Sequence, residues 1–163
     1  MASTTLKEEF EIKIAPAPAL RVIGMKIRSS LEFASRDCPK LWQESFAPRM
    51  TEVVGFNGAA YGVSVMIDCE TMTFDYLAAV SAAPDAAVPS GMEAMSLSGG
   101  TYAQCKVESL AKVSAAYKFV YGPWLEAQSR WELDLSAPCY EFYPAEYMEN
   151  NIFYIYVKVN EKK

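Results

Sequence analysis

The sequence predicts an α+β fold of two tandem strand-helix-strand-strand modules with antiparallel sheets, related by a pseudo-twofold axis around a central cleft. Three observations support this prediction. Runs of alternating apolar and polar residues, typical of half-buried strands, recur in both halves of the chain. Each half also has one stretch with apolar residues at helical spacing. A small, proline-punctuated linker, 81–91, separates a first module at about 8–82 from a second at about 90–160, within one domain covering 1–163.

The first module begins with a predicted pair of strands, "FEIKIA" and "LRVIGMKIRS", interrupted by "PAPA". A helix is expected over 38–54, where Pro39 suits a first turn and Pro48 favours two shorter helical pieces. Two further alternating strands with a tight polar connection complete the module. The strands expected here are 10–15, 20–29, 60–68 and 73–81.

The second module repeats this order. A strand pair is expected over 92–107, joined near Gly99 and Gly100. A helix is expected within 109–125, ending near Gly122 and Pro123 or continuing weakly to Trp124. The last expected strands are 139–145 and 151–160, with "EYMEN" between them.

Composition excludes several classes of function. The 15 basic and 20 acidic residues give a net charge of −5, the wrong sign for phosphate-dominated DNA binding. Apolar runs fall short of the roughly 18 residues that a membrane span requires. The polar start "MASTTLKEEF" lacks the apolar core of a signal peptide. We therefore expect a cytoplasmic protein with no direct DNA binding and no membrane partner.

The residues available for chemistry are restricted. The chain has no histidine, so it has no Ser-His-Asp or Cys-His arrangement and no histidine-containing metal motif. It also lacks the glycine-rich motifs that cradle nucleotide phosphates. Cys38, Cys69, Cys105 and Cys139 are widely spaced and form no C-x-x-C pair, which favours reduced core residues over a metal site. We expect no metal and no cofactor, so any chemistry would rest on carboxylates, tyrosines or water.

Glu141 is the leading candidate for a site residue. It is flanked by Tyr140, Phe142 and Tyr143 at the start of an expected strand, where a charge without a partner is costly to bury. No lysine or arginine lies within ten residues on either side of it. Glu141 and Tyr143 share one face of the strand. Three environments are open to Glu141 on that face: solvent, a tyrosine hydroxyl or a cationic ligand.

The succession of "YGVSVMID", "FDYLAAV", "VPSGMEAMSLSGGTYAQCKV", "YGPWL" and "YEFYP…IFYIYVKV" resembles the GyrI-like superfamily over residues 8–160. That superfamily includes the effector-binding domains of AraC-type and MerR-type multidrug regulators, integron cassette proteins and gyrase-inhibitory proteins. The resemblance implies a pocket for hydrophobic, often cationic, small molecules, in which a carboxylate on a late strand faces the ligand. The matching position here is Glu141.

Three aromatic residues join Glu141 and Tyr143 as candidates for ligand binding. Tyr61 and Tyr76 lie on adjacent expected strands, and a tyrosine offers a face that attracts cations and a hydroxyl that bonds a carboxylate. Trp124 ends the second expected helix, where its ring could wall the cleft. Core packing is the alternative for each of the three. Trp42 is expected to be a core residue.

We therefore expect a stand-alone binding protein for hydrophobic, cationic small molecules, acting in drug or effector sensing or sequestration. Ten tyrosines, eight methionines and a negative net charge suit an adaptable, electronegative cavity. Only about nine residues precede the first expected strand, too few for the DNA-binding unit of a complete regulator. One alternative is a hydrolase of reactive small molecules that uses the same carboxylate. Another is a gyrase-inhibitory interaction protein, and a homodimer or protein partner is also left open.

Overall fold

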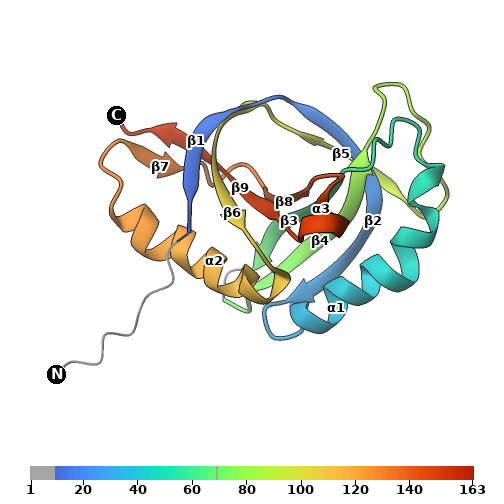
Figure 1. Cartoon of the computed structure of the whole chain (residues 1–163), viewed down its shortest axis with the longest axis horizontal. Helices are drawn as coiled ribbons and strands as arrows, with labels where there is room; N and C mark the ends of the chain where they lie inside the picture. Colours follow the sequence, from blue (N-terminus) through green and yellow to red (C-terminus); the bar gives the residue numbers. More distant parts are fainter. Residues whose placement is uncertain (1–9, 69) are drawn as a thin grey trace.

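The computed structural model describes residues 10–68 and 70–163, and nine strands in this part of the chain form one curved antiparallel sheet (Figure 1). The strands are β1 (Ile12–Ala17), β2 (Leu20–Ser30), β3 (Ala60–Asp68), β4 (Thr73–Ser81), β5 (Glu93–Leu97), β6 (Gly100–Val107), β7 (Trp131–Leu133), β8 (Cys139–Tyr143) and β9 (Phe153–Glu161). The helical segments are α1 (Ala34–Lys40), η1 (Leu41–Phe46), η2 (Ala47–Glu52), η3 (Leu110–Lys112), α2 (Val113–Phe119), η4 (Val120–Trp124) and α3 (Tyr147–Asn150). The prediction of an α+β fold with antiparallel pairing is confirmed.

The prediction that the first two strands of each half pair with each other is wrong, and so is the prediction of separate sheets. β1 pairs with β6 and β2 pairs with β5, so strands of the first half pair with strands of the second. The register runs unbroken through the corner, from Ala17 opposite Gly100 to Leu20 opposite Leu97. Pro18 and Ala19 bend the chain without reversing it, and β1 and β2 continue as one bent strand.

The strand order of the sheet is β1-β6-β9-β8-β3-β4-β2-β5, with β7 added beside β9. Strands of the first and second halves meet at its centre, where β3 pairs with β8. Four pairs of strands are equivalent in the two halves: β1 and β5, β2 and β6, β3 and β8, and β4 and β9. When the members of each pair are exchanged, the strand order reads the same in the opposite direction. The junction between β3 and β8 is therefore the middle of the sheet.

Both expected helices are present, each as a series of short helical segments. The first run covers residues 34–52, starting four residues before the predicted start, and Pro48 falls at the beginning of the 3₁₀ segment η2. The second run continues past Pro123 and includes Trp124, the further of the two expected ends. Two short elements were not expected: β7, between the second helix and the strand expected at 139–145, and α3, inside the connection "EYMEN".

The two faces of the sheet contribute to different parts of the core. Successive side chains of a strand point to opposite faces of the sheet. In β9, Phe153, Ile155 and Val157 are buried, whereas Tyr154 and Tyr156 between them are half-buried. One face packs against the helical runs in two clusters, one around Phe46 and one around Ala116. The opposite face forms a third cluster built only from strand residues.

The segment between β4 and β5 is described in full and contains no helix or strand. Arg21 fixes it by donating hydrogen bonds from Nη1 to the carbonyl oxygens of Ala83 and Ala86, both at 2.9 Å. Among the described residues, no helix has the length and apolar character needed to cross a membrane.

Candidate functional site

Glu141 lies in the middle of the sheet, on the face covered by the helical runs. It is opposite Gly62 of β3 on one side and Ile155 of β9 on the other. Only 8% of its surface is exposed. An ionised carboxyl at this depth needs hydrogen-bond donors or an opposite charge to offset its lost hydration.

Three phenol hydroxyls donate to the Glu141 carboxylate, and they come from three different elements. Tyr143 of β8 donates to Oε1 at 2.6 Å, and Tyr117 of α2 donates to Oε2 at 2.7 Å. Tyr76 of β4 donates to Oε1 over a longer 3.4 Å. Bonds from hydroxyls to a charged acceptor are stronger than neutral ones, and these three hold the carboxylate in a fixed position.

The first helical run contributes a fourth aromatic residue. The indole Nε1 of Trp42 in η1 donates to the Tyr76 hydroxyl at 2.9 Å. Its ring meets the Tyr143 ring edge to face, with the ring centres 6.1 Å apart. We call Glu141, Trp42, Tyr76, Tyr117 and Tyr143 the Glu141 cluster. It joins both helical runs across the central strands of the sheet.

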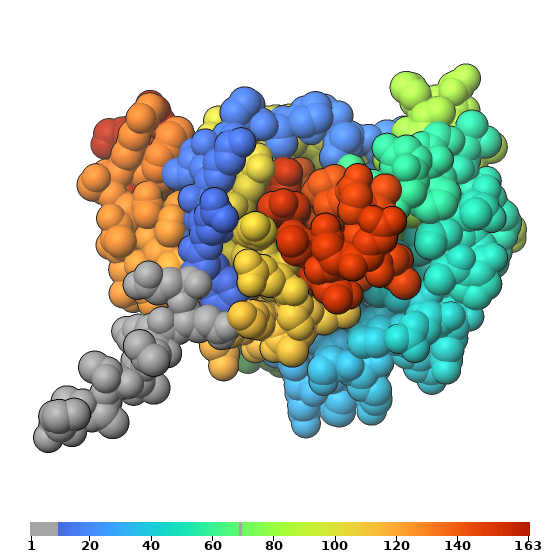
Figure 2. All heavy atoms as spheres, viewed as in Figure 1, coloured from blue at the N-terminus to red at the C-terminus, as the bar shows by residue number. Residues whose placement is uncertain are grey.

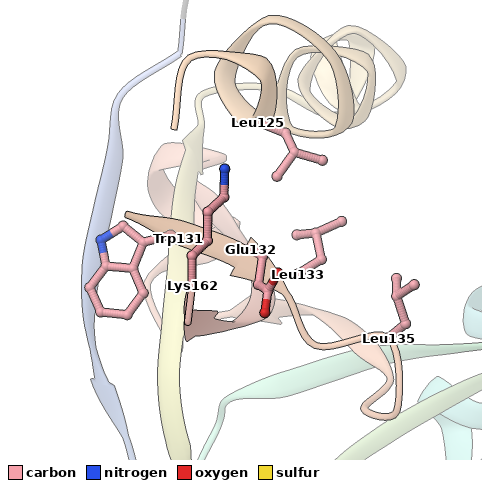
Figure 3. A pocket seen from close by; sticks show the side chains of 6 residues that line it. All are labelled: Leu125, Trp131, Glu132, Leu133, Leu135 and Lys162. Atoms are coloured by element: carbon pink, nitrogen blue, oxygen red, sulfur yellow. The ribbon is translucent and has the colours of Figure 1, made fainter. Parts of the chain in front are cut away.

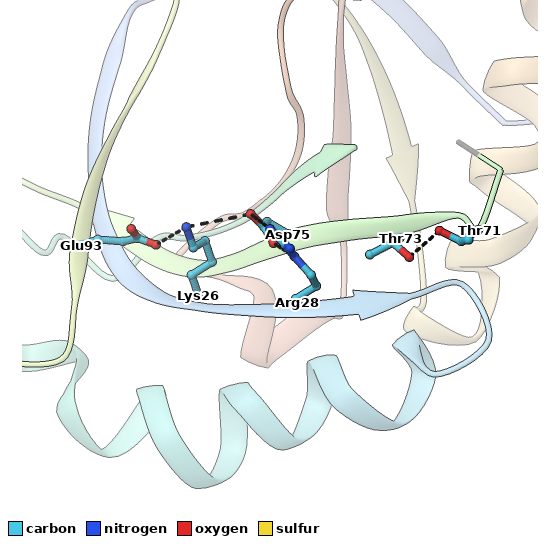
Figure 4. Close-up of polar contacts among 6 residues, drawn as sticks. All are labelled: Lys26, Arg28, Thr71, Thr73, Asp75 and Glu93. Carbon is cyan, nitrogen blue, oxygen red and sulfur yellow. Dashed lines mark hydrogen bonds and ion pairs between the residues drawn. The ribbon is translucent and has the colours of Figure 1, made fainter. Parts of the chain in front are cut away.

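No cationic side chain of the described residues pairs with Glu141. On the opposite face of the sheet, by contrast, charges are matched by charges (Figure 4). There Asp75 of β4 pairs with Arg28 at 2.9 Å and with Lys26 at 3.9 Å, and Lys26 also reaches Glu93 at 3.2 Å. Glu141 is therefore a buried carboxyl whose described partners are all neutral phenols.

Burial and hydrogen bonding act on Glu141 in opposite directions. Burial raises its pKa above the ordinary value of 4.5, and the bonds from Tyr143, Tyr117 and Tyr76 oppose that rise. Burial, followed by the charge of Glu141, raises the pKa of Tyr76 and Tyr117 well above 10. The phenols consequently stay protonated, and remain donors, at neutral pH.

The segment that follows Glu141 covers the cluster. Tyr147 in α3 packs edge to face on Tyr143, with ring centres 5.0 Å apart, and also contacts the ring of Phe153. Figure 2 shows the orange-red segment around α3 at the surface, between the helical runs drawn in teal and gold. Aromatic side chains of the cluster and of α3 therefore surround Glu141.

A separate hollow of about 340 Å³ lies beside β7 and shares no lining residue with the Glu141 cluster (Figure 3). Its lining residues are Leu125, Trp131, Glu132, Leu133, Leu135 and Lys162. The Lys162 ammonium donates to the carbonyl oxygen of Gln128 at 2.8 Å.

The structure brings three of the five predicted site residues together: Glu141, Tyr143 and Tyr76. Tyr61 points to the opposite face, where its ring packs with Tyr140 and Phe142, because β3 places Gly62 and not Tyr61 on the Glu141 side.

Trp124 packs against the cluster of buried residues around Ala116, with no hydrogen bond to Glu141. The sequence reasoning missed Tyr117 and assigned Trp42 to the core. The available signal was the helical spacing that puts Tyr117 on the buried face of its helix beside Val113 and Val120.

Cys38, Cys105 and Cys139 are free thiols; Cys105 is buried and the other two are half-buried. Cys69 lies outside the described residues. No group of three or more histidine, cysteine, aspartate or glutamate residues in the described part of the chain could hold a metal ion. Burial, followed by the nearby charge of Glu141, raises the pKa of the Cys38 thiol to about 12.

A known protein family matches nearly the whole of this sequence. The model of the family Cass2, "Integron-associated effector binding protein", matches residues 13–159. The chain belongs to that family. No curated protein sequence matches this Cass2 family member significantly.

Three solved structures share the fold of this Cass2 protein. An integron cassette protein from the mobile metagenome of Vibrio cholerae has a TM-score of 0.67 at 17% identity, covering 93% of this chain and 97% of that one. SAV2435 bound to tetraphenylphosphonium has a TM-score of 0.68 at 14% identity, covering 92% and 94%. The EcmrR C-terminal domain has a TM-score of 0.65 at 12% identity, covering 94% and 99%. The expected resemblance to effector-binding proteins of integron cassettes is confirmed by the family match, and at these identities the structures show a common fold.

Proposed function

We propose that this Cass2 protein binds hydrophobic organic cations, with Glu141 as their counter-charge. The observation that carries the proposal is a carboxylate at the centre of the sheet that is 8% exposed and bonded only to phenols among the described residues. Such a group loses hydration on folding and gains no ion pair in return. A bound cation would supply the missing charge.

The aromatic members of the Glu141 cluster suit the same ligand. Tyrosine and tryptophan rings attract cations through their faces and bury large apolar areas. The structure of SAV2435 with tetraphenylphosphonium, a hydrophobic cation, supports this ligand class on a shared fold. We assign Tyr76, Tyr117 and Tyr143 to the wall of the site, with Trp42 behind Tyr76 as its hydrogen-bond donor. Trp124, which packs against the same buried residues as Tyr117 and Tyr143, remains a candidate, whereas Tyr61 lies on the opposite face of the sheet.

We further propose that the two halves are related by a pseudo-twofold axis through the junction of β3 and β8. The reversible strand order and the position of the Glu141 cluster between both helical runs support this arrangement. The ligand would then lie between equivalent elements of the two halves. This is a common place for a small-molecule site.

Titration calorimetry with tetraphenylphosphonium and with neutral triphenylphosphine oxide tests the proposed function. We expect a dissociation constant of about 1 μM for the cation, equivalent to about −8 kcal/mol, and much weaker binding of the neutral compound. Equal affinities would contradict the counter-charge role. Chromatography of the ligand after incubation distinguishes binding from hydrolysis, because only the hydrolase alternative produces a new compound.

A further inference from the structure

The Trp42 indole determines how the Tyr76 hydroxyl is used. An indole N–H can only donate, whereas a phenol hydroxyl donates one hydrogen bond and accepts others. Since Trp42 Nε1 donates to the Tyr76 oxygen at 2.9 Å, the phenol proton must point to a different acceptor. The Glu141 Oε1 atom, 3.4 Å from that hydroxyl, is such an acceptor.

Gly62 leaves the space in which Tyr76 and Glu141 approach each other. A Cβ atom at this position would lie 2.2 Å from the Tyr76 hydroxyl oxygen and 3.0 Å from Glu141 Oε1. The first distance is too short for any side chain, and the second is a tight contact. The backbone of β3 thus permits the contact, and Trp42 orients the group that makes it.

Trp42 is itself held firmly enough for this role. Its ring packs edge to face on Phe46, with ring centres 5.6 Å apart, and on Tyr143 at 6.1 Å. It belongs to η1, a π-helical segment whose Leu41 and Phe46 are buried. Segments of this kind occur often at functional sites.

We propose that Trp42 is a positioning residue of the cation site, which acts through Tyr76 to stabilise the ionised form of Glu141. The hydrogen bond from Trp42 polarises the Tyr76 hydroxyl and makes it a better donor. This inference rests on the proposed function, since the ionised form is the one that a cation requires.

Other titratable groups also face Glu141 and must be considered in any pH experiment. They come from every element packed around it: Cys38 of α1, Tyr76 of β4, Tyr117 of α2, Cys139 and Tyr143 of β8, and Tyr147 of α3. All of them are neutral when protonated, and burial raises the pKa of each. Glu141 is the only carboxyl among these groups, and the others are thiols and phenols.

The test is tetraphenylphosphonium affinity as a function of pH in wild type and Trp42→Phe, which keeps a ring and removes the N–H. Below the midpoint of the Glu141 titration, we expect binding by the variant to be about three- to tenfold weaker, the size of one hydrogen bond. The midpoint should rise by about 0.5 to 1 pH unit. Well above it, the two affinities should converge, because Glu141 is then ionised in both proteins. A loss that persists at every pH would overturn the proposal.

Two further variants separate positioning from packing. Tyr76→Phe and the double variant Trp42→Phe/Tyr76→Phe should bind within about twofold of each other, because Trp42 acts only through the hydroxyl that is already gone. Independent losses that multiply would refute the idea. The matched control is Trp131→Phe at β7, which should leave the pH profile unchanged.

A measurement without ligand keeps this inference separate from the proposed function. The infrared band of the protonated Glu141 carboxyl, identified by its loss in Glu141→Gln, reports the midpoint directly. If tetraphenylphosphonium does not bind wild type, the proposed function fails, but the infrared midpoint still tests Trp42. An identical midpoint in wild type and Trp42→Phe would overturn the positioning role.

Discussion

Replacing Glu141 by glutamine removes the charge of the site while keeping its shape. The amide oxygen can still accept from Tyr143 and Tyr76, whose hydroxyls lie 2.6 and 3.4 Å from Oε1. The amide nitrogen at the Oε2 position cannot accept from Tyr117, whose hydroxyl must turn and become the acceptor. One of the three hydrogen bonds changes direction and none has to be abandoned.

The expected loss of cation affinity is about 2 to 4 kcal/mol, the range for removing one member of a buried charge pair. This corresponds to an increase of about 30- to 1,000-fold in the dissociation constant for tetraphenylphosphonium. Binding of neutral triphenylphosphine oxide should change by less than about threefold. Stability without ligand should change by only about 1 kcal/mol, because weaker hydrogen bonds are offset by the relief of burying a charge.

Calorimetry with both compounds on both proteins measures these changes, and urea unfolding measures stability. Equal losses for the cation and the neutral compound would show that Glu141 shapes the site without recognising charge. Unchanged affinity for both compounds would place Glu141 outside the binding site.

Four further results are expected. Tetraphenylphosphonium affinity should rise with pH as the Glu141 carboxyl, whose pKa is raised by burial, loses its proton, and calorimetry of Glu141→Gln should show no such dependence. The raised pKa also makes the free energy of unfolding depend on pH: the contribution of Glu141 is complete below about pH 4.5 and is lost as the pH rises through its higher folded-state pKa. Urea unfolding from pH 4 to 8 measures this loss against Glu141→Gln. Gly62→Ala should destabilise the fold by about 1 to 3 kcal/mol, because the added methyl group would lie 2.2 Å from the Tyr76 hydroxyl oxygen, and a normal melting temperature would contradict this. Cys38 and Cys105, with pKa values raised to about 12, should react slowly with iodoacetamide at pH 8, as followed by mass spectrometry, whereas rapid labelling would show that these thiols are accessible and ionised.

Local patterns predicted most of the elements and the pairing of β3 with β4, but not the partners of the first two strands of each half. Alternation in "FEIKIA" and "LRVIGMKIRS" identifies two strands, yet it carries no information on their partners, and the assumed local pairing was wrong. β7 has only three residues, too few for a periodic signal. The helical runs were predictable because each carries several apolar residues at helical spacing.

The same distinction applies to the site. Glu141 and Tyr143 are two residues apart in one strand, so their common face followed from the period of a β-strand. Tyr117 and Trp42 reach the carboxylate from two helical runs, across distances that only tertiary packing establishes. The sequence could not show on which face of the sheet Tyr61 lies; in the structure its neighbour Gly62, which has no side chain, is the residue that faces Glu141.

The pairing of β1 with β6 and of β2 with β5 has a consequence for how the chain folds. Ile12 meets its partner Cys105 only after about 90 further residues have been synthesised, and Gly62 waits about 80 residues for Glu141. Closing such long loops costs entropy before any contact repays it, so folding should be slow for a chain of this size. A ribosome-bound intermediate that ends after β4 would have strand edges with no partner yet made, and is the stage at which we expect the nascent chain to be most prone to aggregation.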